Sequence, residues 1–248
     1  MKKYSLLFFI LFPLFAWAND CKTNVDKNNI SFLLLGQSNM AGQGKVRELD
    51  KLWLKQADNL CFYLNGSLAH FKQQEKFGPE IAFAHDMALA YPNKRINLVK
   101  FAPGGSLMKD WLASGKHYLT LKKQLSKIRK STPLHFKGVL WMQGERDTKS
   151  KKLALSYENE LIHFIQLIRT DVKQQKLDFV IGKISIPEAY RPAVKEVKQA
   201  QEAVTSKLRF VKIIPTDTLK KNKDNVHYST EGQLALGHLF AKKLLSPK

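Results

Sequence analysis

Cysteine is scarce in this chain, with two residues among 248. No zinc-finger spacing is present, and arginine and lysine form no compact run, so the sequence argues against a nucleic-acid-binding module. The formal net charge is nevertheless +20, because 41 lysines and arginines face 21 acidic residues. The lysines are dispersed along the chain, as expected of a solvated surface. Such a surface can attract an anionic polysaccharide or lipid headgroups.

A metal-ligand pattern is also missing. Six histidines have no spacing typical of metal sites, and we interpret them as surface or packing residues: His70, His85, His117, His135, His163 and His238. We therefore expect no metal and no other cofactor.

Long apolar runs are absent after the first eighteen residues, so we expect no stable membrane insertion of the mature chain. Those eighteen residues resemble a secretory signal peptide, with Lys2 and Lys3 at the start, an apolar core over 6–15 and a small-x-small site at 16–18. We expect export to the periplasm or the medium. A retained signal anchor is the alternative. The residues before Cys21 do not form a lipoprotein pattern.

Residues 19–248 contain no low-complexity linker and no internal repeat, which predicts one α/β domain. Short apolar or β-branched runs alternate there with helix-like segments, which predicts a three-layer α/β/α sandwich with a mostly parallel five-stranded sheet. We expect a flavodoxin-like strand order, 2-1-3-4-5, with a further edge strand at 210–214. The five expected strands cover 30–35, 59–63, 95–101, 136–142 and 179–186. The expected helices cover 80–90, 118–130, 153–172, 194–206 and 230–245.

Cys21 precedes the first expected strand, and Cys61 lies in the second. If these strands are neighbours, a disulfide is geometrically reasonable in an exported protein, and its loop of about 40 residues would contribute roughly 4 kcal/mol in the chain-entropy model. The alternative is one buried thiol in the sheet and one loose thiol near the terminus.

Ser38 occupies a position typical of a nucleophile. It lies in Gly-Gln-Ser-Asn-Met at 36–40, directly behind the apolar run at 30–35, so the glycine allows a sharp turn at the carboxyl end of a buried strand. A serine hydroxyl needs a base, and Asp224-x-x-His227 offers a carboxylate that can orient an imidazole. The pattern indicates a serine esterase.

Five ordered blocks resemble those of the SGNH hydrolases, within them the sialate O-acetylesterase and carbohydrate esterase family 6 branch. They are Gly-Gln-Ser-Asn-Met at 36–40, Phe-Gly-Pro-Glu at 77–80, Ala-Pro-Gly-Gly-Ser at 102–106, Trp-Met-Gln-Gly-Glu at 141–145 and Asp-x-x-His at 224–227. The resemblance covers residues 30–245 and implies the same α/β/α fold.

The resemblance implies Ser38 as nucleophile, His227 as general base and acid, and Asp224 as the residue that orients His227. It also implies an oxyanion hole formed by the N–H groups of Ser38 and Gly105 and by the side-chain amide of Gln143. The wider superfamily has asparagine at this third position. The glutamine is usual in the branch named above.

Other residues of the same blocks are expected to support the site. Gln37 and Asn39 flank the nucleophile, and Gly104 precedes Gly105. Glu145 is expected to orient its neighbours rather than transfer a proton. Glu80 is equally well explained as an acid in the first turn of a helix.

The function implied is removal of O-acetyl groups from a carbohydrate, either a sialic acid ester or an acetylated polysaccharide, through an acyl-enzyme. Two alternatives remain, a carbohydrate-binding protein without turnover and an esterase of lipids or small esters. Trp111 and Tyr190 are candidates for stacking on a sugar ring, and packing roles explain them equally well. The sequence does not fix the sugar, the ester position or the oligomeric state.

Overall fold

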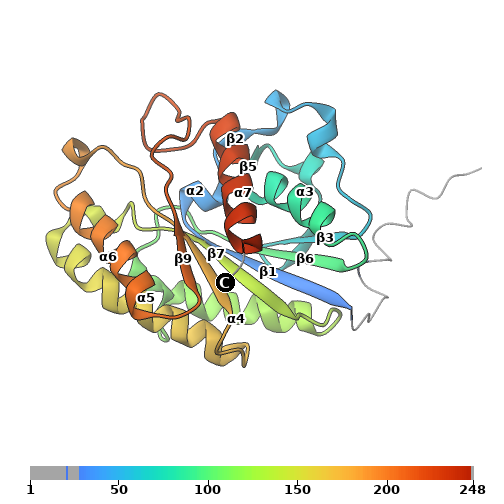
Figure 1. The fold of residues 1–248 in the computed structure, drawn as a ribbon, viewed down its shortest axis with the longest axis horizontal. Coiled ribbons are helices and arrows are strands. Elements are labelled where there is room, and N and C mark those ends of the chain that lie inside the picture. The colour runs from blue at the N-terminus through green and yellow to red at the C-terminus, as the bar shows by residue number, and fades with distance from the viewer. Residues whose placement is uncertain (1–20, 22–27, 247–248) are drawn as a thin grey trace, which may run out of the picture.

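The computed structural model describes Cys21 and residues 28–246, so the expected signal peptide lies outside the described residues. A seven-stranded sheet forms the centre of the molecule, in the order β4-β3-β6-β1-β7-β8-β9 (Figure 1). Its strands are β1 (Asn29–Gly36), β3 (Leu60–Leu64), β4 (Ser67–Ala69), β6 (Arg95–Phe101), β7 (Phe136–Met142), β8 (Asp178–Gly182) and β9 (Val211–Ile214). All neighbouring strands are parallel except β3 and β4, which are antiparallel. A separate antiparallel pair joins β2 (Gly44–Lys45) to β5 (Lys76–Phe77).

Helices cover both faces of the sheet, as expected for the three-layer sandwich (Figure 1). On one face lie α4 (Lys116–Arg129), α5 (Lys151–Asp171) and α6 (Val194–Lys207), and on the other lie α3 (Glu80–Ala90) and α7 (Thr230–Leu245). A short helix, α2 (Ser38–Ala41), follows β1. The 3₁₀ turns are η1 (Val46–Glu48), η2 (Lys51–Leu54), η3 (Phe71–Gln73), η4 (Met108–Trp111), η5 (Asp147–Lys149) and η6 (Glu188–Tyr190).

The apolar run of β1 belongs to two cores because successive side chains of a strand point to opposite faces. Phe32 and Leu34 pack under α3 and α7, whereas Leu33 and Leu35 pack under the other three helices. A strand buried on both faces needs no polar alternation, which explains its continuous hydrophobicity.

The predicted position of the segment at 59–63 was wrong. The order 2-1-3-4-5 holds for β6-β1-β7-β8-β9, but the second place belongs to β6, and the predicted second strand is β3, outside β6. Leu60 pairs with Ile96 of β6, and β6 separates β3 from β1 in the sheet. Hydrophobic alternation identifies a buried strand but carries no information on which neighbour it pairs with. The predicted edge strand at 210–214 is present as β9.

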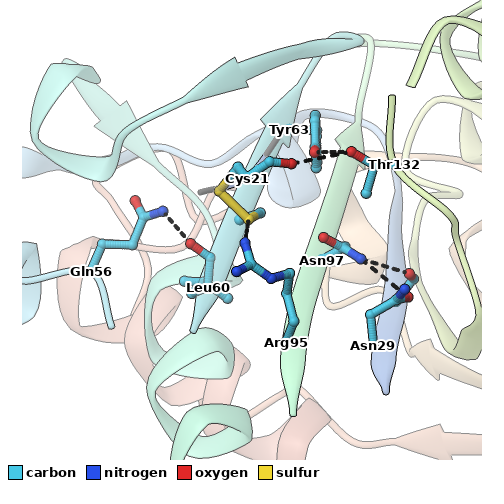
Figure 2. Close-up of a disulfide and its surroundings, with 10 residues drawn as sticks. Cys21, Asn29, Gln56, Leu60, Tyr63, Arg95, Asn97 and Thr132 are labelled. Carbon is cyan, nitrogen blue, oxygen red and sulfur yellow. Dashed lines mark hydrogen bonds between the residues drawn. A yellow bond between two sulfur atoms is a disulfide. The ribbon is translucent and has the colours of Figure 1, made fainter. Parts of the chain in front are cut away.

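Cys21 and Cys61 form the predicted disulfide, with their Cα atoms 5.8 Å apart (Figure 2). The bridge does not join adjacent strands. It fastens the segment before β1 to β3, and the carbonyl oxygen of Cys21 also accepts a hydrogen bond from Thr132 at 3.3 Å. In residues 28–246, no helix has the length and apolar composition required to cross a membrane.

Candidate functional site

The predicted site residues meet at the carboxyl ends of β6, β1 and β7, which are adjacent in the sheet. A small hollow of about 170 Å³ lies there. Its lining consists of Gln37, Ser38, Gly105, Glu145, Arg146, Lys149, Ile186, Arg191, Val226 and His227. A larger hollow of about 630 Å³ lies at the opposite end of the strands, beside Phe136 and Asp178, but it is lined by neither a serine nor a histidine. The hollow that holds the predicted residues is therefore not the larger of the two.

The end of β1 places Ser38 in the hollow. A side chain at Gly36 would bring its Cβ within 2.0 Å of the carbonyl oxygen of Met142, so only glycine allows β1 and β7 to remain this close. The N–H of Gln37 then donates to the same carbonyl at 2.9 Å, after which the chain turns into α2.

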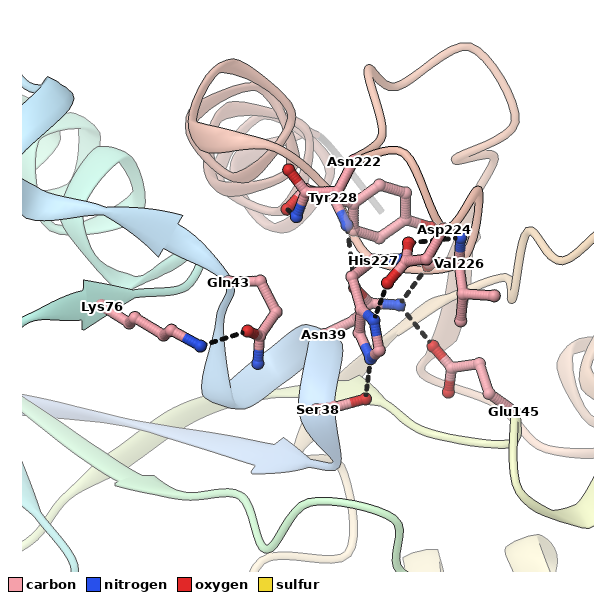
Figure 3. A network of polar contacts seen from close by, with 10 residues as sticks. All are labelled: Ser38, Asn39, Gln43, Lys76, Glu145, Asn222, Asp224, Val226, His227 and Tyr228. Carbon is pink, nitrogen blue, oxygen red and sulfur yellow. Dashed lines mark hydrogen bonds and ion pairs between the residues drawn. The ribbon is translucent and has the colours of Figure 1, made fainter.

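Ser38, His227 and Asp224 form a continuous hydrogen-bonded chain (Figure 3). Ser38 Oγ lies 2.9 Å from His227 Nε2, and His227 Nδ1 lies 2.7 Å from Asp224 Oδ2. Because a carboxylate only accepts, Nδ1 carries the proton and Nε2 is free to accept one from the serine hydroxyl. The predicted nucleophile, base and orienting acid are thus within hydrogen-bonding distance, although 189 positions separate the serine from the histidine.

Asp224 is held by its own loop. Its Oδ1 accepts the backbone N–H groups of Val226 at 3.0 Å and of His227 at 2.9 Å. Partial burial raises the pKa of Asp224, but these two bonds and the bond from the imidazole outweigh it, so the pKa lies below its usual value. The carboxylate therefore remains ionised at neutral pH.

Asn39 connects α2, the helix that begins at Ser38, to the loop that carries His227 (Figure 3). Its Nδ2 donates to the carbonyl oxygen of Val226 at 3.1 Å, and its Oδ1 accepts from the N–H of Tyr228 at 3.1 Å. These are the residues on either side of His227. Nδ2 also donates to Glu145 Oε1 at 2.6 Å. Burial raises the pKa of Glu145, whose other oxygen has no hydrogen-bond partner in the described part of the chain.

Gly105 and Gln143 differ in how they relate to the hollow. Gly105 lines it and has φ of 64°, a left-handed conformation that favours glycine, whereas Gly104 is not part of the lining and has space for a side chain. Gln143 is fully buried and is absent from the lining. Its Nε2 donates to the carbonyl oxygen of Ser106 at 2.8 Å and to Asp147 Oδ2 at 2.7 Å. The role of Gln143 in an oxyanion hole stays a prediction.

Sequence reasoning missed three cations of the lining, Arg146, Lys149 and Arg191. Arg146 directly follows the fourth block, so its position was available as a signal, but Arg191 lies in a loop without a pattern. Among the described residues their side chains have no hydrogen bond and no ion pair. Trp111, a candidate for sugar stacking, is fully buried against Trp141 and Phe164.

Two further predicted residues have defined surroundings. Tyr190 is 49% exposed, and its hydroxyl accepts a hydrogen bond from Asn225 in the histidine loop at 3.2 Å. Glu80 is buried and forms an ion pair of 2.6 Å with Lys100 of β6. Within residues 28–246, no group of three histidine, cysteine or acidic side chains is arranged to hold a metal.

Comparison with known proteins finds similarity over nearly the whole described chain. Residues 28–246 match the family model described as carbohydrate esterase, sialic acid-specific acetylesterase. A probable carbohydrate esterase of Arabidopsis thaliana is 30% identical over 242 residues, which cover 88% of this chain and 91% of that protein.

Solved structures give the same result for the fold. The X-ray structure of a protein from Arabidopsis thaliana has a TM-score of 0.77 at 26% identity and covers 88% of this chain and 98% of that chain. The crystal structure of NanS has a TM-score of 0.69 at 14% identity and covers 88% of this chain and 96% of that chain.

Proposed function

This chain belongs to the carbohydrate esterase family of sialic acid-specific acetylesterases, and from that membership we propose that it removes O-acetyl groups from a carbohydrate through an acyl-enzyme on Ser38. The observation that carries the proposal is the hydrogen-bonded chain from Ser38 through His227 to Asp224 at the hollow. Without this hydrogen-bonded arrangement of three side chains, the fold alone would not specify a reaction.

The reaction begins when Ser38 Oγ attacks the acetyl carbonyl carbon while His227 Nε2 takes the hydroxyl proton. The tetrahedral intermediate then expels the sugar oxygen, which receives that proton, and the acetyl group remains on Ser38. In the second half, His227 takes a proton from water, the hydroxide attacks the acetyl carbon, and acetate leaves as the proton returns to Ser38. Asp224 stabilises the imidazolium in both halves.

Neither alternative function has support in the site. A binding protein without turnover would have no need for a serine aligned with a base and an acid at 2.9 and 2.7 Å. An esterase of lipids would need a broad apolar binding surface, whereas Ile186 and Val226 are the only apolar side chains among the described residues that line the hollow.

The substrate class that the lining favours is an acidic sugar. Arg146, Lys149 and Arg191 place three positive charges around the hollow, and Glu145 is the one acidic residue of that lining. Cations without a protein partner can bind a substrate carboxylate through charge-assisted hydrogen bonds. A neutral acetylated sugar would leave all three unused.

The expected place of action is outside the cytoplasm. The basic and apolar start of the sequence is typical of a secretory signal, and the disulfide between Cys21 and Cys61 requires an oxidising compartment in ordinary cells. Both features support export to the periplasm or the medium.

Ser38→Ala tests the reaction. We expect hydrolysis of an activated acetate ester, and acetate release from an O-acetylated sugar, to fall by at least about 10³-fold. Ser114→Ala, at an exposed serine outside the hollow, serves as the control and should keep wild-type activity. Full activity in Ser38→Ala protein with a wild-type melting curve would disprove the proposed nucleophile.

A further inference from the structure

Tyr190 is an aromatic side chain that packing covers only in part. Six large apolar side chains of the described residues are exposed, and Tyr190, at 49%, is the one aromatic among them. It lies in the loop between β8 and α6, directly before Arg191, which lines the hollow. A tyrosine ring gains free energy when an apolar surface covers it. The exposed part of this ring is therefore available to a ligand of the hollow.

One hydrogen bond places the Tyr190 side chain beside the hollow. Its hydroxyl accepts from Asn225 Nδ2 at 3.2 Å, so it reaches the loop between β9 and α7. The residues that follow the two partners, Arg191 and Val226, both line the hollow. Ile186, earlier in the same loop as Tyr190, lines it as well. The bond between the two loops therefore lies at the rim of the site.

The backbone on both sides of this bond is fixed. Tyr190 ends the 3₁₀ turn η6, and its N–H donates to the carbonyl oxygen of Pro187 at 2.9 Å. Asn225 has φ of 53°, a left-handed conformation that asparagine adopts readily. A second bond, from Lys221 Nζ to Ser185 Oγ at 2.8 Å, joins the same two loops. Little conformational freedom of the ring then remains to be lost when a ligand binds.

A sugar ring suits this arrangement. A pyranose presents a face of C–H groups that packs on an aromatic ring, and hydroxyls at its edge that need polar partners. Tyr190 offers both, since its oxygen accepts from Asn225 while its own hydrogen stays free for donation. Arg191 adds a positive charge at the next position. A lipid chain would use the ring but neither the hydroxyl nor the charge.

We infer that Tyr190 forms a subsite in which its ring packs against the sugar ring of the substrate while the ester lies at Ser38. This inference rests on the proposed esterase function and names a part of the substrate that is recognised outside the acetyl group. Asn225 is a positioning residue, because it acts through the tyrosine hydroxyl. The contact is the same in the ground state and the transition state, so its loss should raise KM and leave kcat little changed.

Tyr190→Ala tests the subsite. For the better of two substrates, an O-acetylated sialic acid or an acetylated xylooligosaccharide, we expect KM to rise about tenfold. Ethyl acetate, an ester without a ring, should respond much less. Leu89→Ala is the matched control, because it removes an exposed apolar side chain from the last turn of α3, before the start of β6 and so at the other end of the strands. It should change neither KM.

A double-mutant cycle tests the anchor. Tyr190→Phe keeps the ring and removes the hydroxyl, and Asn225→Gly removes the amide but allows the left-handed backbone. We expect each to raise KM for the sugar ester about two- to threefold, as loss of one hydrogen bond implies. The double variant should lose no more than either single variant, since both remove the same bond. Additive losses would overturn the role of Asn225.

Binding without turnover separates the subsite from the reaction. In the Ser38→Ala background, titration calorimetry with the same sugar ester should give a dissociation constant about tenfold higher once Tyr190→Ala is added. An unchanged dissociation constant, or equal rises in KM for the sugar ester and for ethyl acetate, would overturn the inference. Failure of the proposed function would show instead as full activity in Ser38→Ala protein, a result that is independent of residue 190.

Discussion

At the scale of single residues, Asn39 determines where His227 stands. Three hydrogen bonds from one buried side chain bind the peptide groups on both sides of the histidine and the carboxylate of Glu145. Ser38 is the adjacent residue, so the same short stretch of backbone positions both Ser38 and His227. Displacement of a reacting group by about 1 Å can reduce a rate about 10²-fold.

Two substitutions of Asn39 should therefore impair catalysis with different pH dependence. Asn39→Leu removes all three bonds, and we expect kcat to fall about 10²-fold at every pH, with KM little changed. Asn39→Asp keeps the acceptor for the N–H of Tyr228 but places a carboxylate against Glu145. Burial already raises the pKa of Glu145, and a second carboxylate raises it further, so below that pKa the pair shares one proton.

The measurement is the ratio of variant to wild-type kcat across the pH range. For Asn39→Asp the ratio should be highest at low pH, where the shared proton restores a hydrogen bond, and should fall as the pH rises. For Asn39→Leu it should stay flat. Equal pH profiles for both variants would show that Glu145 does not face residue 39 as a charged group.

The juxtaposition of Ser38, His227 and Asp224 was predictable from sequence because the chemistry of a nucleophile, a base and an orienting acid restricts the residue types. Ser38, Asp224 and His227 stand in short patterns at the ends of expected elements. In the structure, His227 lies 2.9 Å from Ser38 and 2.7 Å from Asp224. Arg191 was not predictable, since an arginine in a loop has many possible positions. The burial of Trp111 was equally hidden, because an indole suits a core and a sugar site alike.

At the scale of secondary structure elements, a buried ion pair holds the carboxyl end of α2, the helix that begins at Ser38. Lys100 of β6 donates to Glu80, at the start of α3. It also donates to the carbonyl oxygen of Ala41, the last residue of α2, at 2.8 Å. Burial lowers the pKa of Lys100, and Glu80 opposes this change. The pair thus joins β6 and α3 to the helix that begins at Ser38.

Lys100→Met should strongly destabilise the protein. The substitution leaves Glu80 buried without its cation, and we expect the free energy of unfolding to fall by about 3 to 5 kcal/mol. Adding Glu80→Gln removes the unpaired charge and keeps an acceptor for the N–H of Gly78, so the double variant should regain much of the loss. Urea denaturation of the two single variants and the double variant measures the coupling. Additive losses would contradict the pairing.

Element types were easier to predict than their arrangement. The expected helices at 80–90 and 230–245 coincide with α3 and α7, because helix starts are local signals: Pro79 directly precedes α3, and Ser229 caps α7. Strand order is a long-range property. β6 inserts between β1 and β3, which follow one another in sequence among the strands of the main sheet, and no local pattern of β3 announces this. The same holds for the disulfide, which forms although its expected reason, adjacent strands, was wrong.

At the scale of the whole molecule, positive charge is dispersed, but some cations form ion pairs and others do not. The formal net charge of +20 falls to +18 once Lys2 and Lys3 are removed with the expected signal peptide. Many lysines are paired at the surface, such as Lys183 with Glu202 and Lys220 with Glu231. The cations beside Ser38 have no such partners among the described residues. A general positive field would attract any polyanion, whereas a local cluster can select one substrate group.

Removal of one of these cations should distinguish local selection from the general field. We expect Arg191→Met to raise KM for an O-acetylated sialic acid about tenfold, as loss of a hydrogen bond to a charged group of roughly 1.5 kcal/mol implies, and to leave a neutral acetylated xylooligosaccharide nearly unaffected. Lys123→Met, on the exposed side of α4, removes the same charge far from the cluster and should change neither KM. Added salt should reduce the wild-type preference for the acidic ester, because mobile ions screen partly exposed charges. If both variants alter the acidic substrate equally, attraction by net charge explains the preference, and Arg191 has no specific part in it.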